Sequence, residues 1–183
     1  MIDMNGVTIY GSQLGYIDAF EPETNVSSFT LDGFTTEYHR LIGLSISWLN
    51  PLSGATKLIM RPNGIATLPA GSGSQRDGFN FETQVREDDS FPDLVIAELN
   101  AGQANTYVVG SAFLHMGTAQ PGRMFIGRGL QHDKNPAGNA VRRSADRIGI
   151  FNENSMTITS LEIRTDNGSA AIGAGSRFFL FAA

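Results

Sequence analysis

Apolar and polar residues alternate along residues 38–50, the most informative stretch of the chain. One face of an extended strand there carries only large apolar residues, Ile42, Leu44, Ile46 and Trp48. Gly43, Ser45 and Ser47 fall on the other face, and such period-two alternation predicts a half-buried antiparallel strand. The alternation stops at the breaker-rich residues 50–54 and resumes over residues 56–60. The pattern therefore predicts a β-hairpin.

Weaker alternation marks further strands along the chain. We expect strands over residues 28–32, 79–85, 106–116, 123–127, 147–151, 156–164 and 172–183. The segment 106–116 is apolar on both faces, which predicts a central strand covered on both sides. Residues 93–100 fit either a strand or one or two helical turns. We expect a tight turn at 61–64, a flexible loop at 70–78 and the longest irregular stretch at 128–146.

Eight to ten short strands separated by long loops predict an all-β protein. The expected architecture is an antiparallel β-sandwich, jelly-roll-like, with long irregular loops. Residues 1–26 hold one short strand candidate among several breakers, so we expect an N-terminal arm there and a β-sandwich domain over 27–183. The last strand ends apolar, which predicts that the C-terminus is tucked into a sheet or an interface. Phe179 and Phe181 are therefore candidate interface residues.

Composition bounds the class of protein. The chain has 183 residues, and 41% of them are hydrophobic, enough for a real core. Charged residues make up only 17%, which fits either a partner-covered surface or Ser, Thr and Asn standing in for charge. Cysteine is absent, so neither disulfides nor thiolate metal sites are expected. The N-terminus lacks a signal-peptide pattern and no apolar run suits a membrane helix, so we expect a soluble, cytoplasmically made protein with no membrane partner.

The charge is unevenly distributed. The net charge of −5 disfavours a nucleic-acid partner. Residues 82–98 carry six acids against one arginine, a balance of −5, and residues 123–147 carry six basic residues against two acids, a balance of +4. These segments are either two solvated loops or complementary patches that meet across a subunit contact. In the second case the contact residues are Glu87, Asp88, Asp89, Arg142, Arg143 and Arg147.

Candidate chemistry is sparse. The three histidines are isolated and match no zinc-ligand spacing, and no Gly-x-Ser-x-Gly nucleophile motif occurs. The run Glu87-Asp88-Asp89 is either a hard-cation ligand set or a solvated acidic turn, and it lacks the spacing of a calcium loop. Trp48 is either a core residue or part of a sugar-binding platform, and its apolar face favours the core. We expect no catalytic residue, metal or cofactor, and therefore no enzyme.

Three segments resemble structural proteins of tailed-bacteriophage virions. They are Phe29-Thr-Leu-Asp-Gly33 leading into Tyr38-His-Arg-Leu-Ile-Gly43, the strand and turn Leu58-Ile-Met-Arg-Pro-Asn-Gly64, and Ile172-Gly-Ala-Gly-Ser-Arg-Phe-Phe-Leu-Phe181. Similar segments occur in phage β-sandwich proteins that decorate capsids or build fibres and baseplates. The resemblance implies a virion component made in the bacterial cytoplasm, usually trimeric, and it supplies no catalytic residues.

Composition, pattern and resemblance together lead to one expectation. The chain is expected to be a capsid decoration or cement protein, a homotrimer bound to the major capsid protein in the virion. The alternative is a tail-fibre or baseplate module that binds a host surface glycan. A glycan-degrading enzyme is disfavoured, because the chain is small and shows neither a depolymerase-like repeat nor a paired-carboxylate motif.

Overall fold

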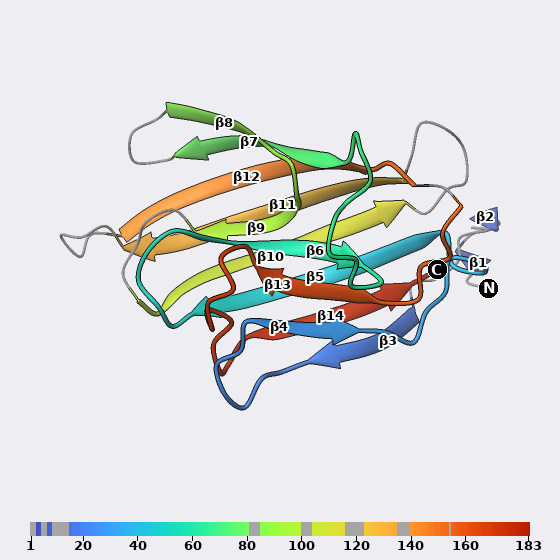
Figure 1. The fold of residues 1–183 in the computed structure, drawn as a ribbon, viewed down its shortest axis with the longest axis horizontal. Helices are drawn as coiled ribbons and strands as arrows, with labels where there is room; N and C mark the ends of the chain where they lie inside the picture. The colour runs from blue at the N-terminus through green and yellow to red at the C-terminus, as the bar shows by residue number, and fades with distance from the viewer. Residues whose placement is uncertain are drawn as a thin grey trace.

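Two antiparallel β-sheets lie one over the other, as the ribbon in Figure 1 shows. The computed structural model describes residues 3–4, 7–8, 15–80, 85–99, 104–115, 123–134, 140–153 and 155–183. Every regular element in these ranges is a β-strand, so the predicted all-β class is confirmed and the paired sheets are consistent with a β-sandwich. A separate short pair, β1 (Asp3–Met4) and β2 (Val7–Thr8), lies outside the two sheets.

The larger sheet has eight strands and the smaller has four. The order in the large sheet is β3 (Gly15–Phe20), β14 (Arg177–Ala182), β5 (Leu41–Asn50), β10 (Thr106–His115), β11 (Arg123–Lys134), β12 (Ala140–Phe151), β7 (Gly73–Asn80) and β8 (Val85–Phe91). The order in the small sheet is β4 (Ser28–Leu31), β13 (Leu161–Thr165), β6 (Thr56–Pro62) and β9 (Leu94–Leu99). Four strands therefore face eight, and one side of the large sheet has no second layer from the described chain (Figure 1).

The apolar core fills the space between the sheets. The large sheet contributes the predicted face of β5 together with Phe178 and Leu180 of β14. The small sheet contributes Leu31, Met60 and Leu161 among others. Trp48 is 0% exposed, and its indole N–H donates to the carbonyl of Ala171 at 2.8 Å. The prediction that Trp48 is a core residue is therefore confirmed, and its ring is closed to a sugar ligand.

The predicted hairpin between residues 38–50 and 56–60 is wrong. Both strands exist, as β5 and β6, but they belong to different sheets: β5 pairs with β10 and β14, and β6 pairs with β9 and β13. Leu58 and Met60 of β6 share one buried cluster with the apolar face of β5. The two apolar faces therefore meet across the core, and the breaker segment carries the chain from one sheet to the other. Alternation identifies the buried face of a strand but not its hydrogen-bonding partner.

Two segments expected to be loops are strands. Most of residues 128–146 belongs to the 12-residue strands β11 and β12, which pair from Arg123 with Phe151 to Lys134 with Ala140. Most of residues 70–78 belongs to β7, which pairs with β12. These segments are rich in glycine and polar residues, as loops are. They form strands because the hydrogen bonds between strands join backbone groups and need no particular side chain. The ambiguous segment 93–100 is strand β9, and all six of its residues are buried.

The chain ends are partly woven into the large sheet. Residues 15–20 of the expected arm form β3, an edge strand paired with β14, so this part belongs to the sheet. The arm placed over residues 1–14 falls almost wholly outside the described residues. The C-terminal strand β14 lies between β3 and β5, and the backbone N–H of Ala183 donates to the carbonyl of Leu41 at 2.9 Å. The tucked C-terminus is therefore confirmed.

The outer face of the large sheet as candidate interaction surface

Large apolar side chains gather on the outer face of the large sheet, the side turned away from the small sheet. We call the following set the apolar patch; its members come from three adjacent strands and are each 40–56% exposed: Tyr107, Val109, Phe113, Met124, Ile126, Ile148 and Ile150. Exposed apolar patches of this breadth mark interaction sites in soluble proteins.

Strand register explains how the patch forms. Phe113 pairs with Ile126, and Ile126 pairs with Ile148, so their side chains stand side by side across three strands. The same row continues on the other side of β10 through Gly43 to Phe181 and then Tyr16. The Tyr16 and Phe181 rings lie edge to face, with centroids 6.3 Å apart. An apolar row therefore crosses six strands of the sheet.

Strand β10 corrects one prediction and locates the patch. Its sequence predicts cover on both faces, yet among its large apolar residues Val108 and Leu114 are buried, while Tyr107, Val109 and Phe113 are exposed. In a sandwich with one solvated face, outward residues are usually polar. The sequence of β10 is therefore typical of a strand that is packed on both faces, and the described chain packs against only one of them.

A polar row of Ser111, Arg128 and Asp146, in register across β10, β11 and β12, crosses the patch between Val109 and Phe113. Arg128 donates two hydrogen bonds to the carboxylate of Asp146, from Nε at 2.7 Å and from Nη2 at 2.9 Å. This bond lowers the pKa of Asp146 and raises that of Arg128. Beside the row lies a hollow of about 820 Å³, lined by residues of β7, β8 and β12 that include Asp77, Asp89 and Asp146. Among the described residues no group of three or more His, Asp or Glu side chains could hold a metal ion.

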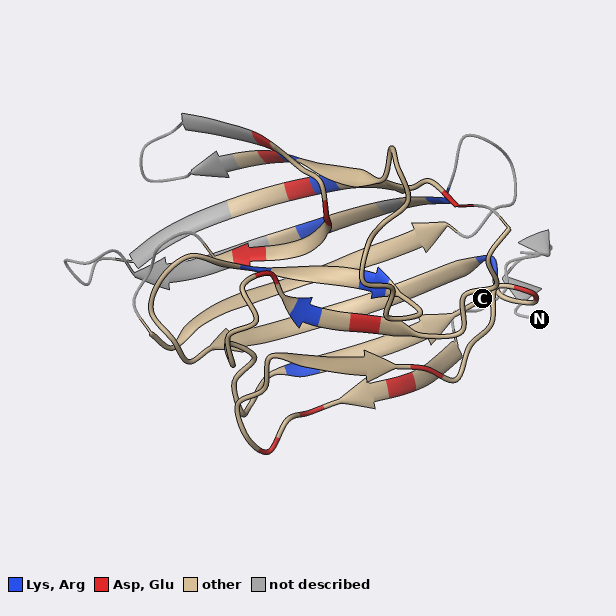
Figure 2. Ribbon diagram, in the orientation of Figure 1, with Lys and Arg blue, Asp and Glu red and all other residues tan. Residues whose placement is uncertain are grey.

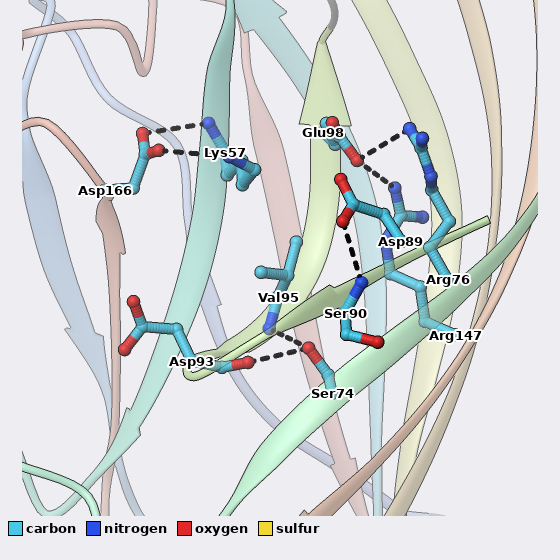
Figure 3. A network of polar contacts seen from close by, with 10 residues as sticks. All are labelled: Lys57, Ser74, Arg76, Asp89, Ser90, Asp93, Val95, Glu98, Arg147 and Asp166. Atoms are coloured by element: carbon cyan, nitrogen blue, oxygen red, sulfur yellow. Dashed lines mark hydrogen bonds and ion pairs between the residues drawn. The ribbon is translucent and has the colours of Figure 1, made fainter. Parts of the chain in front are cut away.

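Charged side chains of β7 and β12 also lie on the inner side of the large sheet, between the two sheets. Glu98 of β9 faces two arginines of the large sheet, with Arg76 Nη1 at 3.0 Å and Arg147 Nη2 at 3.5 Å from its carboxylate (Figure 3). Arg147 is 3% exposed, and burial lowers its pKa to about 10 although Glu98 opposes the shift. Figure 2 shows these charges on β7, β9 and β12, while β5 and β14 are almost free of charge along their length.

Farther along, Arg123 of β11 is also buried. It donates to the carbonyl of Met156, and desolvation lowers its pKa while Glu153 opposes that change. Arg61 of β6 pairs with Asp93 on the outer side of the small sheet, the side to which its register partner Glu162 also belongs. One half of the interior therefore combines arginines with glycines, and the other half is apolar.

The predicted interface residues are scattered by the fold. Phe179 and Phe181 are half-buried on the outer face, and Phe181 belongs to the apolar row. Asp89 is exposed on β8, and the expected acidic turn is part of that edge strand, where Glu87 and Asp88 pair in register with β7. Arg142 and Arg143 lie in β12, and the positions of their side chains, like those of Glu87 and Asp88, fall outside what the structure describes.

Arg147 requires a correction. Its guanidinium lies between the sheets, where it pairs with Glu98 of the acidic segment 82–98. These two opposite charges are therefore satisfied within one chain and do not meet across a subunit contact. The apolar patch on β11 and β12 was missed because its members alternate with glycine and arginine. The i, i+2 spacing of Met124 with Ile126, and of Ile148 with Ile150, is the signal that could have revealed it.

Comparison with known proteins adds no relative. No protein-family model, no curated protein and no solved structure matches this chain. No helix long and apolar enough to span a membrane occurs within the described ranges. The argument for function therefore rests on the outer face of the large sheet.

Proposed function

We propose that the protein is a non-enzymatic structural component of a tailed-bacteriophage virion, a decoration or cement protein that binds and stabilises the head shell. The observation that carries the proposal is the apolar patch on a sheet face that the described chain leaves uncovered. A face of this kind suits permanent protein–protein contact, because burial of exposed isoleucine and phenylalanine side chains under a partner lowers the free energy.

The sequence resemblance supplies the class of partner. The segments that resemble phage virion proteins include β4, β6 with its turn and β14, which together frame the apolar half of the core. The jelly-roll-like arrangement belongs to the same proposal, and the repeated crossings between sheets, from β4 to β5 to β6, support it. In this role the protein is a homo-oligomer bound to the major capsid protein, made in the bacterial cytoplasm and located in the virion.

A decoration protein stabilises a shell through many copies of one contact. A shell protein acts by linking neighbours, and each copy needs only a modest interface because symmetry repeats the contact over the particle. Two-sheet packing with a continuous apolar core gives the rigid plate that such a link requires. No step in this role needs a reactive side chain.

Copy number tests the proposal. Virions purified from the producing culture are separated on a denaturing gel, and the band of this protein is quantified against the major capsid protein. Hundreds of copies per particle are expected for a decoration protein. A few tens of copies would move the protein to the tail fibre or baseplate, and absence from the particles would refute the virion role.

The fibre alternative has one observation in its favour. Tyr107 and Phe113 present aromatic rings on the outer face, and rings of this kind can stack against a sugar. A glycan-binding module would bind host surface polysaccharide through this face, and Tyr107→Ala would abolish binding. A decoration protein would show no such binding.

A further inference from the structure

The normal polarity of a sandwich strand is inverted in β11 and β12. Ile126, Ile148 and Ile150 point outward, and Gly127, Arg147 and Gly149 point inward. Strands of a two-layer sandwich place apolar residues inward and polar residues outward. Around Met124, Ile126, Ile148 and Ile150 the outer face therefore has the composition of an interior, while Arg128 and Asp146 form a polar row on the same face.

The inner side of these strands lies against the buried arginine. A Cβ added to Gly129 would lie 3.7 Å from the nearest guanidinium nitrogen of Arg147, an ordinary van der Waals contact, so Arg147 packs directly against this glycine. The inner side of β12 is thus occupied by a charged group and its partner Glu98. The isoleucines of β11 and β12 lie on the outer face instead, where they are packed only if another molecule covers that face.

The size of the patch matches what one partner brings to a stable contact. Seven side chains exposed by 40–56% offer roughly 600 Å², taking ~150–200 Å² for each fully exposed large side chain. Tyr16, 63% exposed on the continuing row, adds roughly 110 Å² on the same scale. The total is close to the ~800 Å² that each partner buries in an interface of standard size.

The charges within the patch suit a copy of the same face. The polar row that crosses the patch pairs Arg128 with Asp146, so both signs are present side by side and neither dominates. Two copies related by a two-fold axis can therefore offer each sign to its opposite. A strongly acidic or basic partner has no matching field here. The small sheet, in contrast, turns Glu162 and Arg164 of β13 away from the core, as a solvated face does.

We propose that the outer face of the large sheet, centred on Phe113, Ile126 and Ile148, is the contact surface between two copies of this chain. The inference rests on the proposed structural role and names the surface through which that role is exercised. Copies pack face to face, and the apolar patch becomes the second core that the sequence of β10 indicates.

Light scattering of the purified full chain tests this assignment. Wild-type protein at tens of micromolar should show at least twice the chain mass of 19.7 kDa. Ile126→Asp and Ile148→Asp, each tested separately, should shift the mass to that of one chain. Leu52→Asp is the matched control, because Leu52 is 41% exposed on the loop that follows β5, at the opposite end of that strand from Gly43, the partner of Phe113, and this variant should keep the wild-type mass.

The emission of Trp48, the only tryptophan, reports folding in each variant. A blue-shifted, buried emission in the aspartate variants is expected. A monomeric wild-type chain would overturn the inference, and so would folded Ile126→Asp and Ile148→Asp variants that keep the wild-type mass. If both aspartate variants lose the buried emission, Ile126→Ser replaces them, and retention of the full mass in that folded variant would also refute the inference.

These results separate the surface assignment from the virion role. An oligomer that dissociates on Ile126→Asp, in a protein absent from purified particles, supports the surface and refutes the decoration function. A monomer in solution that is abundant on particles refutes the surface between copies and supports the decoration function.

Discussion

Replacement of Glu98 by glutamine should strongly destabilise the fold. Glu98 lies on β9 of the small sheet, and the arginines it binds lie on β7 and β12 of the large sheet (Figure 3). Glutamine keeps the size of the side chain and its carbonyl acceptor but removes the negative charge. Arg76 and Arg147, directly opposite each other on the neighbouring strands β7 and β12, would then lie side by side without the carboxylate that binds both.

The magnitude follows from the two distances. At 3.0 and 3.5 Å the attraction is ~5 kcal/mol for each pair with an effective dielectric constant of about 20, before the cost of desolvation is subtracted. The pKa of about 10 for Arg147 means that its buried charge still costs about 3 kcal/mol with Glu98 present. Removal of one partner from a buried pair typically costs ~3–5 kcal/mol, and we expect that loss here.

The pH dependence has a definite sign. The pKa of Arg147 is lower in the folded protein than in the unfolded chain, so the cost of its charge is complete below about pH 10 and is relieved only as the pH rises through that value. Loss of Glu98 removes an interaction that raises the pKa of Arg147, so this pKa falls further in Glu98→Gln, and the loss of stability should be smaller at pH 9 than at pH 6.

Urea unfolding followed by Trp48 emission measures the change, and thermal unfolding should show a fall in Tm of roughly 6–20 °C for a chain of this size. Glu162→Gln is the control, because this residue lies half-buried on the other side of the small sheet and should change stability by under ~0.5 kcal/mol. Arg147→Met added to Glu98→Gln should recover part of the loss by removing an uncompensated charge. If Glu98→Gln is as stable as Glu162→Gln, the buried charge cluster does not hold the sheets together.

Other perturbations test the rest of the structure. Trp48→Ala should lower the free energy of unfolding by ~3–5 kcal/mol, measured by urea unfolding followed by circular dichroism, because a fully buried ring and its hydrogen bond to Ala171 are lost. Gly110→Ala should destabilise far more than Gly129→Ala in thermal unfolding, because the added Cβ would lie 2.5 Å from the Arg128 carbonyl oxygen in the first case and 3.7 Å from its nearest neighbours in the second. Arg128→Gln should raise the pKa of Asp146 toward 3.8 in an NMR titration, since the Arg128 hydrogen bond is the main cause of its lowering. Because the folded pKa of Asp146 is depressed, the contribution of this pair to stability should be present above about pH 4 and fade as the pH falls further.

The parts of the fold that alternation could predict are those with one apolar and one polar face. The buried set on β5 and the turn at Asn63 and Gly64, both with positive φ, follow directly from local residue types. Strand partners do not follow, because pairing is decided by how faces stack over the whole domain. The β5 and β6 segments illustrate this, since the same apolar alternation fits a hairpin and two strands facing each other across a core.

The sequence signal failed where polar residues enter the interior. Residues 128–146 look like a loop because glycine, asparagine and arginine are frequent there, yet most of them form β11 and β12. The buried contact of Arg147 has no local signal either, because Glu98 lies 49 positions before it in the sequence. The pattern predicts the isoleucines of the apolar patch on two short strands, 123–127 and 147–151, on either side of an irregular stretch, so it does not show that they share one face.

The inverted strands and the doubly apolar β10 have one physical explanation in common. The sheet of eight strands has a second layer of four strands on one side only. The residues on its other side decide whether that side is solvated or buried by another molecule. Here Phe113, Ile126 and Ile148 stand in register on that surface, and Arg147 occupies the protected side. Burial of the Arg147 charge between the sheets costs free energy. A protein that acts as a monomer would avoid this cost by placing the arginine on the outer face and the isoleucines between the sheets. The arrangement becomes favourable when burial of the outer face in an assembly adds apolar contact that the isolated chain lacks, so stability and assembly are coupled through the same three strands.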